Sequence, residues 1–236
     1  MRSVADLTPN PGIAVRQLRW QPCYRIIASR LPTIFLFERV ADAADFDALY
    51  RLEALTNPRA LEALGSLEQV PREDRAFGPG ASVIMAPFIY LNPAGGRFTD
   101  PGFGAFYAAR SLTTAIAETR HHREVFLRAT HEAPLEVTMR SYCADIAGRF
   151  HDIRGERARM PDVYAPSSYT ASQKLGRELQ RTGSNGIVYD SVRDPDGQCI
   201  AAYLPRLVRN LRQGVHLRYA WDGNRISHVY ELRPIE

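Results

Sequence analysis

The sequence predicts an α+β fold in which a mixed sheet is flanked by helices. Segments with the two-residue alternation of strands are interleaved with segments whose apolar residues recur at helical spacing. Several strands are joined by short turns, as in hairpins, so a regular series of strand–helix–strand units is not expected. With 236 residues, of which 45% are hydrophobic and 24% charged, the chain can bury one large core without disulfides.

The first 70 residues are expected to form a helical extension that packs on the core. Apolar residues at helical spacing from Phe46 to Leu55 predict one helix, and a second is expected over residues 59–64. The polar, turn-rich stretch from Pro71 to Gly80 then predicts the boundary with a main domain spanning residues 71–236.

The middle of the chain predicts a strand, a loop and a helix. Ser82 to Leu91 is apolar and predicts a strand, with Pro87 at an edge or a bend. A loop rich in glycine and proline follows from Asn92 to Gly104 and leads into a short strand over residues 105–109. Ser111 is a favourable N-cap for the next helix. Its inner side is expected to carry Leu112, Ala115, Ile116, Thr119 and Phe126.

The C-terminal half is expected to be richer in strands. Residues 134–142 alternate as a strand, and residues 145–153 predict another. Residues 172–181 predict a helix that ends at Gly183 in the left-handed conformation. Two hairpins follow, one between strands 187–193 and 198–204, the other between strands 215–221 and 226–232.

The composition excludes several classes of protein. The three cysteines lie far apart and form no C-x-x-C pair, which argues against a disulfide framework and against zinc. The N-terminus lacks the apolar core of a signal peptide, and no segment reaches the roughly 20 apolar residues that span a bilayer. We therefore expect a soluble, cytoplasmic protein. Its net charge of +4 fits a phosphate-bearing ligand, an acidic partner or nucleic acid.

The segment from Gly95 to His122 carries the candidate site. A loop with two glycines and Arg97 precedes a strand with Tyr107, and the helix that begins near Ser111 carries Glu118 in its second turn. Glycines let a ligand approach the backbone, and an arginine near a helix N-terminus favours phosphate. This order fits a dinucleotide, with phosphates on Arg97, a base stacked on Tyr107 and the ribose facing Glu118.

Each candidate also has a structural interpretation. Arg97 could lie on the surface of its loop, and Tyr107 could belong to the core. Glu118 could be a solvated charge beside neighbouring arginines. His121-His122 is more typical of a helix surface than of a metal pair, because helical ligands prefer a spacing of four residues. Ser191, which no nucleophile motif surrounds, could be a structural strand hydroxyl.

Two parts of the sequence resemble the motifs of the RES family. The run GGRF…FYAARSLTTAIAE, within residues 95–118, is similar to its Gly-Gly-Arg loop, Tyr strand and Thr-Ala-x-x-Glu helix. Residues 186–193 (GIVYDSVR) are similar to the second motif, in which a serine lies near a strand end. The arginine, glutamate and serine after which the family is named match Arg97, Glu118 and Ser191.

A further arginine of the family lies near the N-terminus, in a Tyr-Arg-aliphatic context. Arg25 fits this context, and Arg39 and Arg75 are its rivals. The resemblance is tight over residues 85–204 and looser before residue 80. The loop has Arg-Phe-Thr-Asp where many members have Arg-Trp-Asn, so a polar contact there is expected to differ.

The resemblance implies a fold similar to that of NAD-dependent ADP-ribosyltransferase toxins, and an enzyme that consumes NAD by hydrolysis or phosphorolysis. NAD would be the substrate and inorganic phosphate a candidate co-substrate, with no permanent cofactor and no metal. Glu118 would stabilise the oxocarbenium-like ribose, and Arg97, with Arg25 as a second candidate, would bind the pyrophosphate. Tyr107 would stack on a base, and Ser191 would form a hydrogen bond with nicotinamide or its ribose. His122 would shape the pocket or contact the nucleophile.

The resemblance also implies partners. Many members are toxins paired with an Xre-like antitoxin, and this protein would contact nucleic acid only through that antitoxin. No membrane partner is expected. A homodimer is neither predicted nor excluded. The main alternative is an ADP-ribosyltransferase that modifies a protein. More remote alternatives are a basic nucleic-acid-binding module and an inactive structural partner built on the same fold.

Overall fold

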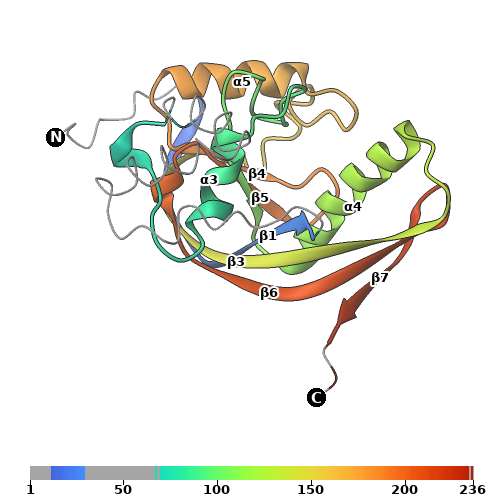
Figure 1. The fold of residues 1–236 in the computed structure, drawn as a ribbon. Coiled ribbons are helices and arrows are strands. Elements are labelled where there is room, and N and C mark those ends of the chain that lie inside the picture. The colour runs from blue at the N-terminus through green and yellow to red at the C-terminus, as the bar shows by residue number, and fades with distance from the viewer. Residues whose placement is uncertain (1–11, 30–66, 68–69, 234, 236) are drawn as a thin grey trace.

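The computed structural model describes residues 12–29, 67, 70–233 and 235, which form a mixed sheet with helices on both of its faces (Figure 1). The strands are β1 (Ala14–Ala28), β2 (Phe106–Ala109), β3 (Leu135–Asp152), β4 (Gly186–Asp190), β5 (Gln198–Ala202), β6 (Val208–Trp221) and β7 (Ile226–Leu232). The α-helices are α3 (Ala81–Ile89), α4 (Leu112–Ala129) and α5 (Thr170–Arg181), and the short 3-10 helices are η1 (Arg72–Asp74) and η2 (Pro205–Leu207). The predicted α+β class with a mixed sheet is confirmed.

The seven strands described here follow the order β1-β2-β5-β4-β3-β6-β7, and β1 also pairs with β3. The ladder therefore closes on itself through β1, β2, β5, β4 and β3. The long strand β3 makes this possible. One of its edges pairs with β1, while the other pairs first with β6 and then, at His151 and Asp152, with β4. The β3–β4 pairing is parallel and the others are antiparallel.

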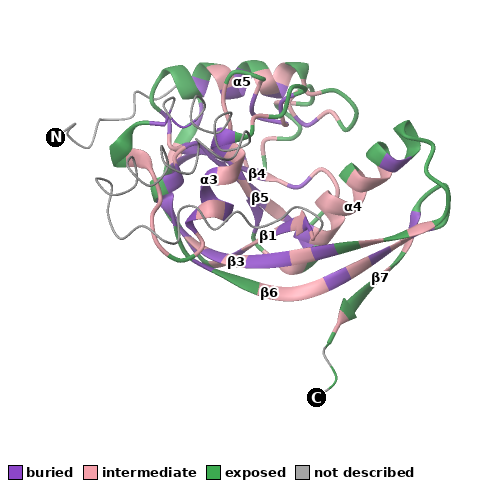
Figure 2. Cartoon of the chain, in the orientation of Figure 1, coloured by how far each residue is buried: buried purple, intermediate pink, exposed green. Residues whose placement is uncertain are grey.

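The two faces of the sheet carry different helices. On one face, α3 packs with Trp20, Phe106 and Phe150 in a core of buried side chains. On the other face, α4 and α5 pack with residues such as Ile187 and Tyr219. Figure 2 shows buried positions along both the strands and α3. Because neighbouring residues of a strand point to opposite faces, β2 contributes Phe106 to the first core and Tyr107 to the second.

Most of the elements predicted after residue 100 are confirmed. Helix α4 begins after Ser111, whose hydroxyl accepts a hydrogen bond from the Thr114 amide at 3.1 Å. Helix α5 is followed by Gly183 at φ +77°, and β4 pairs with β5, and β6 with β7, in antiparallel fashion. The inner side of α4 differs at one position, because Phe126 is 43% exposed while Leu127 is buried.

Three expectations about secondary structure are wrong. Residues 82–91 were expected to form a strand, but 81–89 form helix α3, because a buried helix and a buried strand both give an unbroken apolar run. The strands expected over 134–142 and 145–153 are one strand, β3. Its pairing with β6 shifts register between Arg140 and Tyr142 and again between Cys143 and Asp145, and such irregularities break the alternation.

The N-terminal region also differs from a helical extension where it is described. Residues 14–28 form β1, which pairs along β3 and buries Leu18 and Trp20 at the two-residue spacing of a strand. The helices expected over residues 46–55 and 59–64 lie outside the described residues, and the domain boundary stays a prediction. Within the described ranges, no helix combines the length and apolar character needed to cross a bilayer.

Candidate active site

Arg97 lies at the tip of a tight loop that two glycines make possible. Gly96 and Thr99 form an isolated antiparallel bridge, in which the Gly96 amide donates to the Thr99 carbonyl at 2.9 Å. Gly95 has φ +69°, and a β-carbon there would lie 2.3 Å from that carbonyl oxygen. A β-carbon on Gly96 would lie 2.7 Å from the Tyr107 hydroxyl. Side chains are excluded at both positions, so the Gly-Gly pair allows the close turn that presents Arg97.

Helix α5 holds this loop from the side. Gly176 lies so close to the loop that a β-carbon there would be 2.1 Å from the Phe98 carbonyl oxygen. The Gln173 amide donates to the carbonyls of Ala94 and Gly96 at 3.0 and 3.1 Å. Asp100, at the end of the loop, forms an ion pair with Arg177 of α5. The loop is therefore fixed by α5 on one side and by β2 on the other.

Arg97 is a buried cation with donors to spare. Arg97 is 7% exposed, and its guanidinium lies 4.6 Å from the ring centre of Tyr169. Nη1 donates to the Val163 and Ala165 carbonyls at 3.2 and 3.0 Å. Among the described residues no carboxylate pairs with Arg97, and its hydrogen bonds all start at Nη1. The Nε and Nη2 donors are thus available to an anion.

Tyr107 ties the arginine loop to β2. Its hydroxyl accepts a hydrogen bond from the Phe98 amide at 2.9 Å and lies 3.2 Å from Thr99 Oγ1. Burial raises the pKa of Tyr107 to about 12, so the phenol stays protonated at neutral pH. The ring is half-buried on the face of the sheet that carries α4. Tyr107 is therefore both a loop anchor and an aromatic surface near Arg97.

Glu118 is held by Ser191 across the space between α4 and the β4–β5 hairpin. The Ser191 hydroxyl donates to Glu118 Oε1 at 2.6 Å, and the Cys199 thiol lies 3.9 Å from the same oxygen. Ser191 is 0% exposed, and its oxygen accepts hydrogen bonds from the amides of Arg193 and Asp194 at 3.1 and 3.0 Å. This uses the full hydrogen-bonding capacity of the hydroxyl. Ser191 thus holds Glu118 in place, and its expected contact with a ligand stays a prediction.

A second contact attaches the preceding turn of α4 to the β4–β5 hairpin. Thr114, one turn before Glu118, donates from its hydroxyl to Asp194 Oδ2 at 2.7 Å. A β-carbon on Gly197 would lie 2.5 Å from the Thr114 methyl group, so the hairpin turn and the first turn of α4 are closely packed. These contacts fix the position of the first turn of α4 relative to the hairpin, and Glu118 follows in the next turn.

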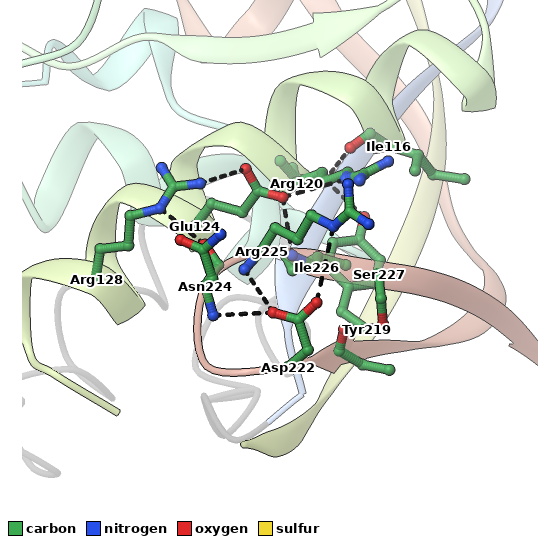
Figure 3. A network of polar contacts seen from close by, with 12 residues as sticks. Ile116, Arg120, Glu124, Arg128, Tyr219, Asp222, Asn224, Arg225, Ile226 and Ser227 are labelled. Carbon is green, nitrogen blue, oxygen red and sulfur yellow. Dashed lines mark hydrogen bonds and ion pairs between the residues drawn. The ribbon is translucent and has the colours of Figure 1, made fainter. Parts of the chain in front are cut away.

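The far half of α4 is attached to the β6–β7 hairpin through a different carboxylate, Glu124 (Figure 3). Glu124 Oε1 accepts from the Ile226 amide at 2.9 Å and from Arg120 Nε at 3.3 Å, and Oε2 accepts from Arg128 at 3.2 Å. Arg128 also donates to the Asn224 carbonyl at 2.9 Å. Arg120 lies two residues after Glu118, a spacing at which helical side chains do not face each other, and it pairs with Glu124.

The structure brings the main predicted residues together. Tyr189 of β4 pairs with Cys199 of β5, whose thiol lies 3.9 Å from Glu118 Oε1, and burial is the main cause of the raised pKa of Tyr189. The Phe98 ring next to Arg97 lies edge-on to Tyr189, with 4.7 Å between ring centres. Tyr189 thus lies among the arginine loop, β2 and α4, so Arg97, Tyr107 and Glu118 belong to one site.

His122 lies one turn beyond Glu118. Desolvation lowers its pKa, Glu118 raises it, and Arg193 and Arg97 lower it further, so the imidazole stays neutral at pH 7. His122 therefore lies within electrostatic reach of Glu118 and of Arg97. In the part of the chain that the structure describes, no three His, Cys, Asp or Glu side chains come together as metal ligands.

Arg25 lies apart from Glu118. Its guanidinium lies 5.0 Å from the ring centre of Phe106, which belongs to the core on the α3 side of the sheet. Nη1 donates to the Tyr107 carbonyl at 2.9 Å, and burial lowers the pKa of Arg25 to about 10. Arg25 thus contacts the site through the main chain of β2. Among its rivals, Arg75 donates to the carbonyls of Val70 and Leu67, and Arg39 lies outside the described residues.

Two residues of the site were not predicted from the sequence. Arg193 donates to the Pro166 carbonyl and lies two residues after Ser191, within the motif quoted above. Cys199 places its buried thiol beside Glu118, and burial together with the Glu118 charge raises its pKa well above the ordinary value. The only sequence signal for Arg193 was its place in the second motif, and for Cys199 there was none.

Comparisons with known proteins identify the family of the chain. The RES domain family profile matches residues 72–222, so the chain belongs to the RES family. The uncharacterized protein y4oC of Sinorhizobium fredii (strain NBRC 101917 / NGR234) is 34% identical over 220 residues, covering 89% of this chain and 90% of that protein. A crystal structure of the M. tuberculosis MbcT–MbcA toxin–antitoxin complex gives a TM-score of 0.46 at 14% identity, covering 88% of this chain and 87% of that one.

Proposed function

We propose that this RES-domain protein binds NAD and breaks the bond between nicotinamide and ribose. With water as the nucleophile the products are nicotinamide and ADP-ribose. With inorganic phosphate they are nicotinamide and ADP-ribose carrying a phosphate at the anomeric carbon. The proposal rests on one observation above all: Glu118 is fixed by Ser191 at 2.6 Å but has no cationic partner among the described residues.

The chemistry needs such a carboxylate. Nicotinamide leaves NAD as a neutral molecule from a cationic pyridinium, so its departure requires no strong acid. The ribose left behind develops oxocarbenium character, and a nearby negative charge stabilises it, as in glycoside hydrolysis. A carboxylate already neutralised by arginine would do this poorly. No cation among the described residues forms an ion pair with Glu118, so its carboxylate is available to the charge that develops on the ribose.

The other residues supply binding. Arg97 offers its Nε and Nη2 donors to the pyrophosphate, because Nη1 alone is used by backbone carbonyls. Tyr107 offers a half-buried ring for stacking against a base, with its hydroxyl anchored to the loop. His122, neutral at pH 7 and one turn from Glu118, is suited to contact the incoming nucleophile.

The direct test is to incubate the purified protein with NAD, with and without phosphate, and to identify the products by mass. Free nicotinamide with ADP-ribose indicates hydrolysis, and a product heavier by a phosphate group indicates phosphorolysis. Label that moves from NAD onto protein would instead identify the protein as an ADP-ribosyltransferase. Intact NAD in every condition, with correctly folded protein, would refute the proposal.

We also propose that the protein is the toxin of a toxin–antitoxin pair, as the RES family implies, with an Xre-like antitoxin as its partner. Depletion of NAD would arrest growth. Inducible expression in a bacterial host should therefore lower cellular NAD and stop growth together, while Glu118→Gln should do neither. Growth arrest with unchanged NAD would separate toxicity from NAD cleavage and contradict this mechanism.

A further inference from the structure

Arg193 is a second cation of the site whose position is fixed by the residues that hold Glu118. Its main-chain amide donates to Ser191 Oγ at 3.1 Å, and the same hydroxyl donates to Glu118 at 2.6 Å. The main chain of Arg193 is therefore one bridging atom away from the candidate catalytic carboxylate. A side chain anchored so closely can reach a substrate bound against Glu118.

The guanidinium of Arg193 has unused hydrogen-bonding capacity. Nη2 donates to the Pro166 carbonyl, whereas Nε is buried without a hydrogen-bond partner. Across the described residues, no carboxylate forms an ion pair with Arg193. A partly buried cation with an unsatisfied donor is unfavourable unless an anion completes it.

Arg193 and Arg97 converge on the same short segment from different elements. Arg97 donates to the carbonyls of Val163 and Ala165, and Arg193 donates to that of Pro166. Both charges also lower the pKa of His122, after the larger effect of desolvation, so both guanidinium groups lie within electrostatic reach of one imidazole. Two arginines therefore face the region of Glu118, where the other nearby carboxylate, Asp194, accepts a hydrogen bond from the Thr114 hydroxyl at 2.7 Å.

We infer that Arg193 contacts the substrate and binds a phosphate oxygen beside Glu118, so that Arg97 and Arg193 together hold one anionic ligand. This inference rests on the proposed function for the identity of the ligand. The phosphate oxygen has two sources, the pyrophosphate of the dinucleotide and inorganic phosphate acting as the nucleophile. A guanidinium suits both, because it donates two parallel hydrogen bonds to phosphate.

The test uses variants that separate charge from anchoring. Arg193→Lys keeps a positive charge, while Arg193→Gln keeps a donor for the Pro166 carbonyl and loses the charge. Arg159→Ala serves as a matched control, because Arg159 lies in the neighbouring segment, is exposed, and pairs with Glu156. Calorimetric titration with inorganic pyrophosphate and with inorganic phosphate measures binding without catalysis. Thermal unfolding confirms that each variant is folded.

Arg193→Gln should weaken binding of at least one probe by about tenfold or more, as expected for loss of a charge-assisted hydrogen bond. Arg193→Lys should keep more affinity than Arg193→Gln, and Arg159→Ala should bind as the wild type does. Equal affinity in all four proteins would overturn the inference. Wild-type affinity in Arg193→Gln together with weakened binding in Arg193→Lys would also overturn it, because the positive charge would then not be the source of the affinity.

Steady-state kinetics then identifies the source of the phosphate. A raised KM for NAD in Arg193→Gln assigns Arg193 to the pyrophosphate, and a raised KM for phosphate assigns it to the nucleophile. Wild-type protein that binds pyrophosphate through Arg193 but leaves NAD intact would refute the proposed function and retain the anion site. Cleavage of NAD with normal KM values in Arg193→Gln would retain the function and refute the inference.

Discussion

Helix α4 carries two carboxylates in opposite situations. Glu124, in the far half of the helix, accepts hydrogen bonds from Arg120, Arg128 and the Ile226 amide (Figure 3). Glu118, nearer the start, accepts a hydrogen bond from the neutral hydroxyl of Ser191, lies 3.9 Å from the Cys199 thiol, and forms no ion pair with any of the described residues. The same residue type on one helix is thus neutralised at one end and left charged at the other.

The difference shows how a helix can separate structural work from chemistry. Arg120 and Arg128 lie four residues on either side of Glu124, the spacing at which helical side chains meet. Glu124 and Arg128 then attach the helix to the β6–β7 hairpin through the Ile226 amide and the Asn224 carbonyl. Because this attachment positions α4 without using Glu118, the latter needs only a light contact that orients it. A site carboxylate that avoids cations is therefore a more informative sign of function than one that is well paired.

The largest expected effect comes from Glu118→Gln, which keeps the shape of the side chain and removes its charge. NAD cleavage should fall by roughly 10²–10³-fold or more, the usual cost of losing one electrostatic contact to the transition state. The initial rate of nicotinamide release measures this. Wild-type turnover by a folded Glu118→Gln protein would remove Glu118 from the chemistry.

Glu124→Gln is the matched variant on the same helix. It should lower the free energy of unfolding by about 1–2 kcal/mol, because charged hydrogen bonds at a mostly buried carboxylate are weakened. The rate of NAD cleavage per folded molecule should stay within about twofold of wild type. If Glu124→Gln loses activity as completely as Glu118→Gln does, the division between the two ends of α4 is wrong.

The next largest effect concerns Arg97. Arg97→Ala should raise the KM for NAD about tenfold or more, because charge-assisted bonds to the pyrophosphate are lost, and should lower kcat less. Steady-state kinetics with varied NAD separates the two constants. An unchanged KM with normal turnover would exclude Arg97 from the phosphate role and leave Glu118 without a neighbour that binds the substrate.

A smaller effect is expected when only the orientation of Glu118 is disturbed. Ser191→Ala removes the 2.6 Å hydrogen bond and should lower kcat by about five- to tenfold, with little change in KM for NAD. Thr114→Val provides a comparison, because it breaks the contact between Thr114 and Asp194 in the same region and leaves the bond to Glu118 in place. An equal loss of kcat in both variants would point to general loosening of the hairpin.

The smallest expected effect is a pH dependence of the stability of the fold, caused by His121 near the middle of α4. The pKa of His121 is lowered to about 4, first by burial and then by the positive charge of Arg193. Because the unfolded chain binds this proton near pH 6.5, the protein should lose stability as the pH falls from 6.5 towards 4. His121→Gln should flatten the profile of unfolding temperature against pH. A profile identical to wild type would exclude His121 as a source of acid sensitivity.

The candidate site was predictable because its residues are close in sequence. Arg97, Tyr107 and Glu118 lie on a loop, a strand and a helix that follow one another, so local structure alone brings them near each other. Ser191 was predicted from its motif, but its role was not. Only the folded chain shows that its hydroxyl is enclosed by Glu118 and by two backbone amides.

The features that were missed depend on contacts distant in sequence. Strand β1 is defined by its pairing with β3, more than a hundred residues away, and α3 by burial against the sheet. The position of Arg25 on the α3 side depends on which face of β1 it occupies, and a shift of one residue would reverse that face. Likewise, the hydrogen bond that Glu124 accepts from the Ile226 amide depends on the position of the β6–β7 hairpin.

A crystal structure of the Glu118→Gln protein with intact NAD would test the central claim most directly. The account predicts that the nicotinamide ribose lies against residue 118 while the pyrophosphate is bound by the Nε and Nη2 donors of Arg97. A dinucleotide whose phosphates lie elsewhere, or whose ribose is turned away from residue 118, would contradict it.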